Sequence, residues 1–307
     1  MTKSTTRLRE LLAQPGTLLA PFTYDGFTAR IAEEAGFDAV YMSGFGTSMS
    51  KGMPDVGLLS QTEMVQNAAY IVEAVSVPVF ADADTGYGNA INVGRTVRQY
   101  ERAGVAGIHI EDQVAPKKCG FFEGKMIIDA DEATNKIQAA VDARTDDDFV
   151  IIARCDALVV NGWDDVERRC RAYRDAGADL VFVDGIRTTD DLAEFAKRLG
   201  DLPRMYNGEL PPADVEALGF QIQIHRGPVF ALYPIIKEMM IELKQKGAIS
   251  AIDRWGSGGA LRMDIANALG LDRITELEQK YATAQKPDPT YHLTPITPDP
   301  TFKRNNQ

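Results

Sequence analysis

The sequence predicts an α/β protein folded as a (β/α)8 barrel. Its 307 residues suit one large barrel domain, since such barrels commonly reach this length as a single unit. In a recurring pattern, a helical segment ends in a small or apolar residue plus glycine. An apolar run typical of a buried parallel strand then follows at once. With four further apolar runs, the expected strands number eight and alternate with amphipathic segments.

The recurring pattern occurs at Ala35-Gly36, Ala103-Gly104, Ala176-Gly177 and Leu218-Gly219. In order along the chain, the expected strands are 17–22, 39–42, 77–81, 107–110, 149–153, 180–183, 204–207 and 220–224. Expected helices between them include 61–74, 92–103, 130–143, 164–176 and 190–198. A doubly wound open sheet is the alternative fold, although the chain lacks the Gly-x-Gly-x-x-Gly turn that suits a dinucleotide.

The C-terminal part departs from the barrel pattern at about residue 255. Helical stretches at 260–269 and 273–284 exceed what eight βα units need, and five prolines between 287 and 302 indicate an extended arm. We therefore expect a catalytic barrel over 1–250, a helical segment for oligomer contacts over 251–286, and a proline-rich tail over 287–307.

Composition excludes several kinds of partner. The chain has 33 Lys and Arg against 44 Asp and Glu, a net charge of −11, which disfavours general attraction to nucleic acid or to an anionic membrane. A polar N-terminal stretch and the lack of a long apolar run predict a cytoplasmic protein. The three cysteines are too few and too scattered for a disulfide framework or a zinc site. An anionic substrate would need a local positive site, which a divalent cation could supply.

Two carboxylates end the third expected strand. Asp82 and Asp84 stand at i and i+2, so they point to the same side, and hard oxygen ligands in this arrangement suit Mg²⁺ or Mn²⁺. A lone Asp-x-Asp is more commonly a capped turn, so this motif is weak by itself. On the next strand, His109 and Glu111 again share a side, where Glu111 could hold a metal-bound water and His109 could donate to a substrate oxygen. A satisfied core histidine is the alternative.

Polar residues also follow most of the other strands, where barrel enzymes place their catalytic groups. The loop after strand four contains Lys117, Cys119 and Gly120, and cationic neighbours favour a reactive thiolate; an ordinary surface loop is the alternative. Arg154 could bind a carboxylate with both guanidinium nitrogens, or could pair structurally with a barrel carboxylate. Strands six and seven end in Asp184 and Asn207, which suit substrate contacts.

The glycine-rich segment after strand two, from Tyr41 through Ser43, Gly44 and Phe45 to Gly46, could leave backbone N–H groups free for a carboxylate or enolate oxygen.

Taken together, these segments resemble the isocitrate lyase and phosphoenolpyruvate mutase superfamily over roughly residues 7–244. The matching segments are Tyr41-Met42-Ser43-Gly44, Pro54-Asp55-Val56-Gly57, Asp82-Ala83-Asp84-Thr85-Gly86-Tyr87-Gly88, His109-Ile110-Glu111-Asp112-Gln113, Lys117-Lys118-Cys119-Gly120 and Ile152-Ala153-Arg154-Cys155-Asp156-Ala157. The resemblance implies a barrel whose C-terminal helix is exchanged between subunits, often in a tetramer.

The same resemblance implies a Mg²⁺-dependent carbon–carbon lyase that cleaves a 2-hydroxy di- or tricarboxylate to pyruvate or glyoxylate plus a carboxylic acid. The metal ligands it implies are Asp82, Asp84 and Glu111, with Asp55 nearby. Catalytic roles would fall to Tyr41, Lys117, Cys119 and Arg154. Substrate contacts would come from Ser43, Gly44, Phe45, Asp55, His109, Gly120, Phe121, Asp184 and Asn207.

Two positions depart from the lyase pattern. Phe121 follows Cys-Gly where lyases have His, and Asp184 stands where the family usually has Glu. These changes predict a less polar distal group on the substrate, such as an alkylated malate. They also leave open an oxaloacetate hydrolase or decarboxylase, a mutase of the carboxyphosphonoenolpyruvate type, and a non-catalytic binding module.

Overall fold

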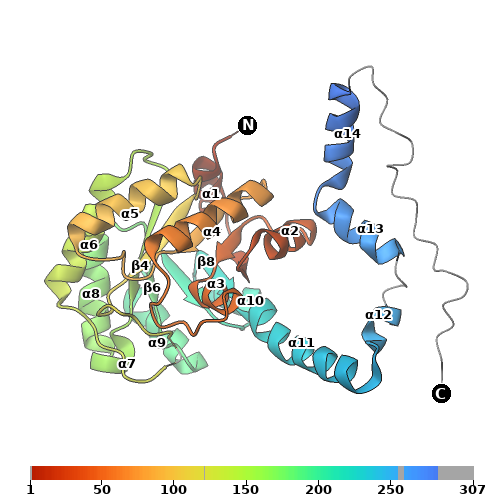
Figure 1. The fold of residues 1–307 in the computed structure, drawn as a ribbon. Helices are drawn as coiled ribbons and strands as arrows, with labels where there is room; N and C mark the ends of the chain where they lie inside the picture. Colours follow the sequence, from red (N-terminus) through yellow and green to blue (C-terminus); the bar gives the residue numbers. More distant parts are fainter. Residues whose placement is uncertain (1, 121, 255–258, 283–307) are drawn as a thin grey trace, which may run out of the picture. The chain divides into compact units, whose positions relative to one another are not determined.

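The predicted (β/α)8 barrel is confirmed by a computed structural model that describes residues 2–120, 122–254 and 259–282 (Figure 1). Eight parallel strands close in sequence order, with β1 hydrogen-bonded to both β2 and β8. The strands are β1 Leu18–Thr23, β2 Val40–Met42, β3 Val79–Asp82, β4 Gly107–Glu111, β5 Val150–Cys155, β6 Leu180–Val183, β7 Arg204–Asn207 and β8 Ile222–His225. Each lies within two residues of its expected position.

Helices connect successive strands and surround the barrel (Figure 1). Their bounds are α1 Ser4–Leu12, α2 Gly26–Glu34, α3 Gly44–Ser50, α4 Gln61–Ala74, α5 Ala90–Arg102, α6 Ala130–Ala143, α7 Leu158–Asn161, α8 Trp163–Asp175, α9 Thr189–Leu199 and α10 Pro212–Ala217. Helix α5 begins two residues before its expected start because the Asn89 side chain accepts from the backbone N–H groups of Ile91 and Asn92.

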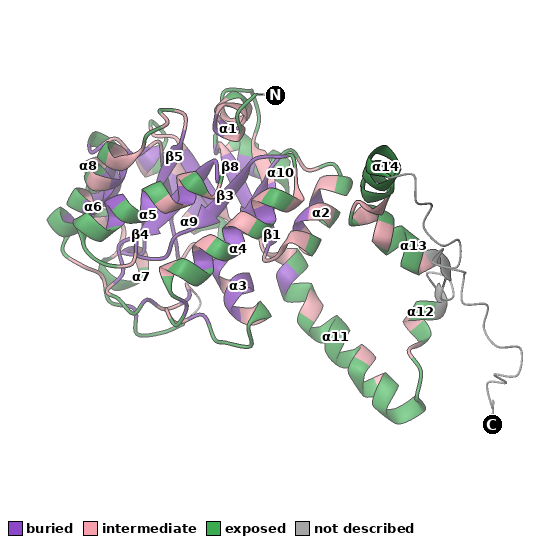
Figure 2. Ribbon diagram, turned by 45° about the horizontal axis from the view of Figure 1, so that its top comes forward, coloured by how far each residue is buried: buried purple, intermediate pink, exposed green. Residues whose placement is uncertain are grey.

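Side chains alternate between two cores along each strand. One core fills the barrel interior, with Phe80, Ile152 and Phe182 among its buried members, and the other lies between the strands and the surrounding helices. Leu8 of α1 is fully buried in the interior core. Figure 2 shows the buried strands inside helices whose outer faces are exposed. The rigid barrel thus holds the ends of its strands in fixed positions.

The described residues that follow β8 are mainly helical. It contains α11 Gly227–Lys246, α12 Ser250–Arg254, α13 Gly259–Ala268 and α14 Leu271–Tyr281, and the chain divides into two compact units after Leu232. The helices expected at 260–269 and 273–284 correspond to α13 and α14, whereas the proline-rich tail at 287–307 lies outside the described residues. None of the described helices is long and apolar enough to cross a membrane.

Replacing Leu8 with Ala should lower the free energy of unfolding by about 2 to 5 kcal/mol, because it leaves a cavity in a fully packed core. Chemical denaturation measures this change. The control is Leu58→Ala, whose side chain is 59% exposed and should matter by no more than about 0.5 kcal/mol. Equal effects of the two substitutions would show that Leu8 does not contribute to the interior core.

Candidate active site

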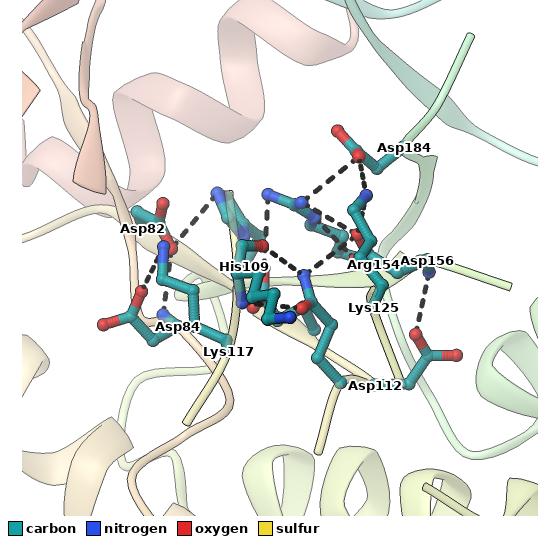
Figure 3. Close-up of polar contacts among 12 residues, drawn as sticks. Asp82, Asp84, His109, Asp112, Lys117, Lys125, Arg154, Asp156 and Asp184 are labelled. Atoms are coloured by element: carbon teal, nitrogen blue, oxygen red, sulfur yellow. Dashed lines mark hydrogen bonds and ion pairs between the residues drawn. The ribbon is translucent and has the colours of Figure 1, made fainter. Parts of the chain in front are cut away.

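The carboxyl ends of the strands bring together a cavity and a dense cluster of charged side chains (Figure 3). The cavity holds about 420 Å³ of empty space, including open solvent at its mouth. It is lined by Phe22, Tyr41, Ser43, Phe45, Asp55, Asp82, Cys119, Gly120, Arg154, Phe182, Asp184, Asn207, Ile224 and Phe230. Most of the residues predicted for substrate binding therefore face one space.

Asp82 is the last residue of β3, and the turn after it holds its carboxylate from two sides. Its Oδ1 accepts from the backbone N–H of Asp84 at 2.9 Å, and its Oδ2 accepts from the N–H of Gly44 at 3.2 Å. A Cβ at position 44 would stand 2.5 Å from Oδ2, so only glycine allows this approach. The contact also corrects one expectation: the Gly44 N–H binds Asp82 and is not free for a substrate oxygen.

Lys117 lies behind the cavity wall and connects two acidic residues. Its Nζ is 2.5 Å from Asp55 Oδ1 and 2.9 Å from Asp84 Oδ1, and its side chain is only 3% exposed. Burial alone would lower the pKa of Lys117, but Asp84 and the neighbouring carboxylates outweigh it and raise that pKa above its usual value. Burial also raises the pKa of Asp84 to about 6, against the opposing charge of Lys117. The ammonium therefore compensates carboxylates and does not reach the cavity.

His109 lies beneath Tyr41. Its side chain is fully buried, and Nε2 is 2.7 Å from the Tyr41 hydroxyl, with the two rings stacked at 5.7 Å. Burial lowers the pKa of His109 to about 4, so the imidazole is neutral at pH 7 and can accept a hydrogen bond from the Tyr41 hydroxyl. His109 is not among the residues that line the cavity, whereas its partner Tyr41 is, so the structure gives the expected substrate contact to Tyr41 rather than to His109.

Arg154 is the centre of a second group of ion pairs, so the structural role considered for it is correct. Its Nε and Nη2 bond both oxygens of Asp156 at 2.8 and 3.0 Å, and Nη1 is 3.2 Å from Glu111 Oε2. Its Nη2 is also 3.4 Å from Asp184 Oδ2. Because Arg154 still lines the cavity, these carboxylates fix its guanidinium in place for a bound anion.

The loop after β4 places Cys119 and Gly120 in the cavity wall. Cys119 is 7% exposed, and its backbone N–H donates to the carbonyl of Asp55 at 3.0 Å. A Cβ at position 120 would stand 2.3 Å from Asp184 Oδ2, so the loop backbone can lie against Asp184 only with glycine there. The expected contact of Phe121 lies outside the described residues.

The two lysines expected to act on the Cys119 thiol have other partners. Lys117 contacts Asp55 and Asp84, and Lys118 Nζ donates to the carbonyl of Glu123 at 3.3 Å.

The sequence did not predict the residues that hold Arg154 and its acidic partners in place. Lys125 Nζ contacts Asp156 Oδ1 at 2.8 Å and Asp184 Oδ2 at 2.6 Å, so it belongs to the Arg154 cluster. Behind them, Asp112 accepts from the Asp156 N–H at 2.8 Å and from Tyr173 at 2.7 Å. The i, i+2 spacing of Arg154 and Asp156 was a signal for their pairing, but no local pattern marks Lys125.

Charge balance favours a divalent cation at this end of the barrel. The buried side chains include the carboxylates of Asp55, Asp82, Asp84, Glu111, Asp112, Asp156 and Asp184, but only five cations accompany them, Lys117, Lys125, Lys136, Arg154 and Arg169. Among the described residues, neither oxygen of Glu111 accepts a hydrogen bond, although Arg154 Nη1 lies 3.2 Å from Oε2. Burial raises the pKa of Glu111 and that of Asp84, so protonation offsets part of the negative charge, and a bound divalent cation would offset it while both groups stay ionised.

The donor set fits Mg²⁺ held largely through water. Within the described ranges, no group of three His, Cys, Asp or Glu side chains is arranged to bind one ion directly, so Asp82, Asp84 and Glu111 do not form a closed triad. Mg²⁺ commonly keeps several waters and binds through one or two carboxylates. Asp82, whose carboxylate reaches the cavity, and Asp84 beside it are suited to that role.

A closed (β/α)8 barrel with carboxylates, an arginine and a thiol at the carboxyl ends of its strands is an arrangement typical of enzymes. A family model described as phosphoenolpyruvate phosphomutase matches residues 8–243. The chain therefore belongs to the phosphoenolpyruvate mutase and isocitrate lyase superfamily, as its motifs predicted.

The relatives include lyases. The chain is 42% identical over 301 residues to 2,3-dimethylmalate lyase of Eubacterium barkeri, covering 91% of this chain and 98% of the relative. It is 38% identical over 256 residues to 2-methylisocitrate lyase of Aeropyrum pernix, covering 80% and 82%. A solved structure of phosphonopyruvate hydrolase in complex with oxalate and Mg²⁺ matches with a TM-score of 0.83 and 31% identity, covering 92% of this chain and all of that one. These findings agree with the prediction of a lyase enzyme.

Replacing Lys117 with Met should lower the free energy of unfolding by about 3 to 5 kcal/mol in a chelating buffer, because Asp55 and Asp84 would remain buried without a cation. Denaturant unfolding measures the loss. Lys118→Met is the matched control, since that ammonium contacts only an exposed carbonyl and its removal should have little effect. A Lys117 variant as stable as the control would refute the compensating role of this ammonium.

Proposed function

We propose that the protein is a Mg²⁺-dependent carbon–carbon lyase that cleaves an alkylated 2-hydroxy dicarboxylate to a 2-oxo acid, such as pyruvate, and a carboxylic acid. The observation that carries this proposal is the mixed lining of the cavity, which combines two kinds of side chain. The first kind, here called the charged half, consists of Asp82, Ser43, Arg154 and Cys119, which provide charge and a proton. The second kind, here called the apolar half, consists of aromatic and aliphatic side chains: Phe22, Phe45, Phe182, Ile224 and Phe230.

The charged half suits the 2-hydroxy acid portion of the substrate. Arg154 lines the cavity with a guanidinium already oriented by Asp156 and Glu111, so it can receive a carboxylate with little loss of side-chain entropy. The Ser43 hydroxyl faces the same space. When bound near Asp82 and Asp84, Mg²⁺ would stabilise negative charge on the substrate oxygen at C2.

Tyr41 and Cys119 serve the reaction from the cavity wall. Tyr41 can hold the substrate hydroxyl by a hydrogen bond, and its own hydroxyl is fixed by His109 Nε2 at 2.7 Å. The pKa of the substrate hydroxyl would be lowered by Mg²⁺ bound near Asp82, so that the hydroxyl proton can leave to water. The C2–C3 bond then breaks, a carbonyl forms at C2, and the electron pair remains on C3, conjugated with the distal carboxylate. The Cys119 thiol in the cavity wall gives its proton to C3 and releases the acid.

The apolar half favours alkyl groups over a further carboxylate. The rings of Phe45 and Phe230 stack at 5.1 Å and form part of this wall. A third carboxylate placed there would lose hydration, and Arg154, the cation among the described lining residues, is already paired with Glu111, Asp156 and Asp184. This chemistry agrees with the similarity to 2,3-dimethylmalate lyase and supports an alkylated malate more than methylisocitrate.

A product screen by mass spectrometry tests the reaction. With Mg²⁺, 2,3-dimethylmalate or citramalate should be cleaved to pyruvate and a carboxylic acid faster than malate, isocitrate or methylisocitrate. Oxalate and acetate from oxaloacetate would identify a hydrolase instead, and pyruvate with CO₂ a decarboxylase. A ³¹P NMR signal for phosphonopyruvate interconversion would identify a mutase. Oxalate binding without any turnover would leave only a binding module.

Replacing Cys119 with Ser should reduce turnover of the best substrate by about 100-fold or more, because serine is a much weaker proton donor. Binding of oxalate with Mg²⁺, measured by calorimetry, should persist. The matched control is Cys170→Ala, which removes a thiol buried in α8 and should retain turnover. Unchanged turnover in the Cys119 variant would remove this thiol from the reaction.

We also propose that the C-terminal helices mediate a homo-oligomer, as a tetramer with exchanged helices would. Large apolar side chains are exposed along α11 and α14, among them Tyr233, Met240, Ile274 and Tyr281. Large apolar side chains that are exposed together on a protein surface usually mark an interaction site.

A further inference from the structure

A buried ammonium connects the Cys119 loop to the ion pairs of Arg154. Residues 113–127, here called the Cys119 loop, begin and end as a short antiparallel pair: Gln113 bridges Ile127, and the Val114 N–H donates to the carbonyl of Met126 at 2.8 Å. Lys125 stands next to this pair with its side chain 2% exposed. The base of the loop is therefore anchored by its own backbone, but those bonds do not fix the loop against the strands.

Contacts hold the loop in two places. Lys117 and the Cys119 N–H hold its first part to Asp55 and Asp84, whereas Lys125 holds its last part to Asp156 and Asp184. Asp156 Oδ1 accepts from Lys125 Nζ at 2.8 Å, from Gln113 Nε2 at 3.1 Å and from Arg154 Nη2 at 3.0 Å. Asp184 Oδ2 lies 2.6 Å from Lys125 Nζ and 3.4 Å from Arg154 Nη2. The loop and the guanidinium thus share the same two acidic partners (Figure 3).

The thiol is tied to the same frame through the loop backbone. Gln113 bonds the backbone of Lys118 in both directions, accepting from its N–H and donating to its carbonyl at 2.9 Å each. Gly120 lies directly against Asp184, the second acidic partner of Lys125. Cys119 stands between these two fixed points, so displacement of the loop would move its sulfur relative to Arg154.

We propose that Lys125 is a positioning residue for the reaction: its ammonium binds the Cys119 loop to Asp156 and Asp184 and so sets the distance between the Cys119 thiol and the anion site at Arg154. In the same arrangement, Asp184 holds the loop through Lys125 and Gly120, in addition to any contact with the substrate. Its shorter side chain, where the sequence departs from the family pattern, meets the long Lys125 side chain. The kinetic part of this inference rests on the proposed role of Cys119, but the structural part does not.

The test measures thiol exposure and kinetics in three variants. In Lys125→Met the loop loses its ionic contact to Asp156 and Asp184, and we expect N-ethylmaleimide to alkylate Cys119 at least about tenfold faster than in the unaltered protein. With the best substrate, kcat should fall about tenfold or more while KM changes little, because Asp156 still orients Arg154. Lys125→Arg keeps the charge and should restore much of both values.

Lys118→Met is the matched control, because it removes another ammonium of the Cys119 loop, one that donates to the exposed Glu123 carbonyl, and leaves the Lys125 contacts to Asp156 and Asp184 intact. Its alkylation rate and kcat should stay near those of the unaltered protein. Cys155 and Cys170 are fully buried and report on folding, since mass spectrometry should find them unlabelled. If Lys125→Met labels them, Lys125→Gln, which keeps a donor, replaces it with the same expected direction.

Cys119 alkylation in a folded Lys125 variant no faster than in the Lys118 control would overturn the positioning role. Because alkylation needs no substrate, that result would leave the lyase proposal untouched. Conversely, a failed product screen would leave the labelling result valid.

Discussion

The excess of buried carboxylates at the carboxyl end of the barrel is the constraint on which the rest of the site depends. Seven such groups lie among five cations, and a buried charge without a partner is costly enough that every nearby element must contribute to its compensation. The Lys117 ammonium forms ion pairs with Asp55 and Asp84, and the Arg154 guanidinium forms ion pairs with three carboxylates. A divalent cation bound there would offset the negative charge that remains, and it would provide the local positive charge that an anionic substrate needs.

The same constraint explains why small residues recur around the cavity. Gly44 and Gly120 each let the backbone lie against a carboxylate, Asp82 in one case and Asp184 in the other. The segment after β2 therefore lies against Asp82, and the Cys119 loop lies against Asp184. The segments that contact these carboxylates also place Ser43, Cys119 and the Arg154 guanidinium in the lining of one cavity.

Much of the fold and part of the site could be predicted from the sequence. Apolar runs and glycine-terminated helices locate all eight strands, since these signals are local, and polar residues directly after a strand must lie at one end of a parallel barrel. Hydrogen-bond partners depend on tertiary packing, which local patterns do not contain. His109 therefore proved to lie beneath Tyr41, the Gly44 amide proved to bind Asp82, and Lys125 was not found, because its acidic partners are 31 and 59 residues away.

We expect this carboxylate cluster to bind one divalent cation through Asp82 and Asp84. Calorimetric titration of the metal-free protein with Mn²⁺ measures this binding directly, without substrate. One ion should bind per chain in the unaltered protein, and the affinity should be lower by about tenfold or more in Asp84→Asn, which removes charge while keeping size. Absence of binding by the unaltered protein, or equal affinity in the variant, would contradict this expectation.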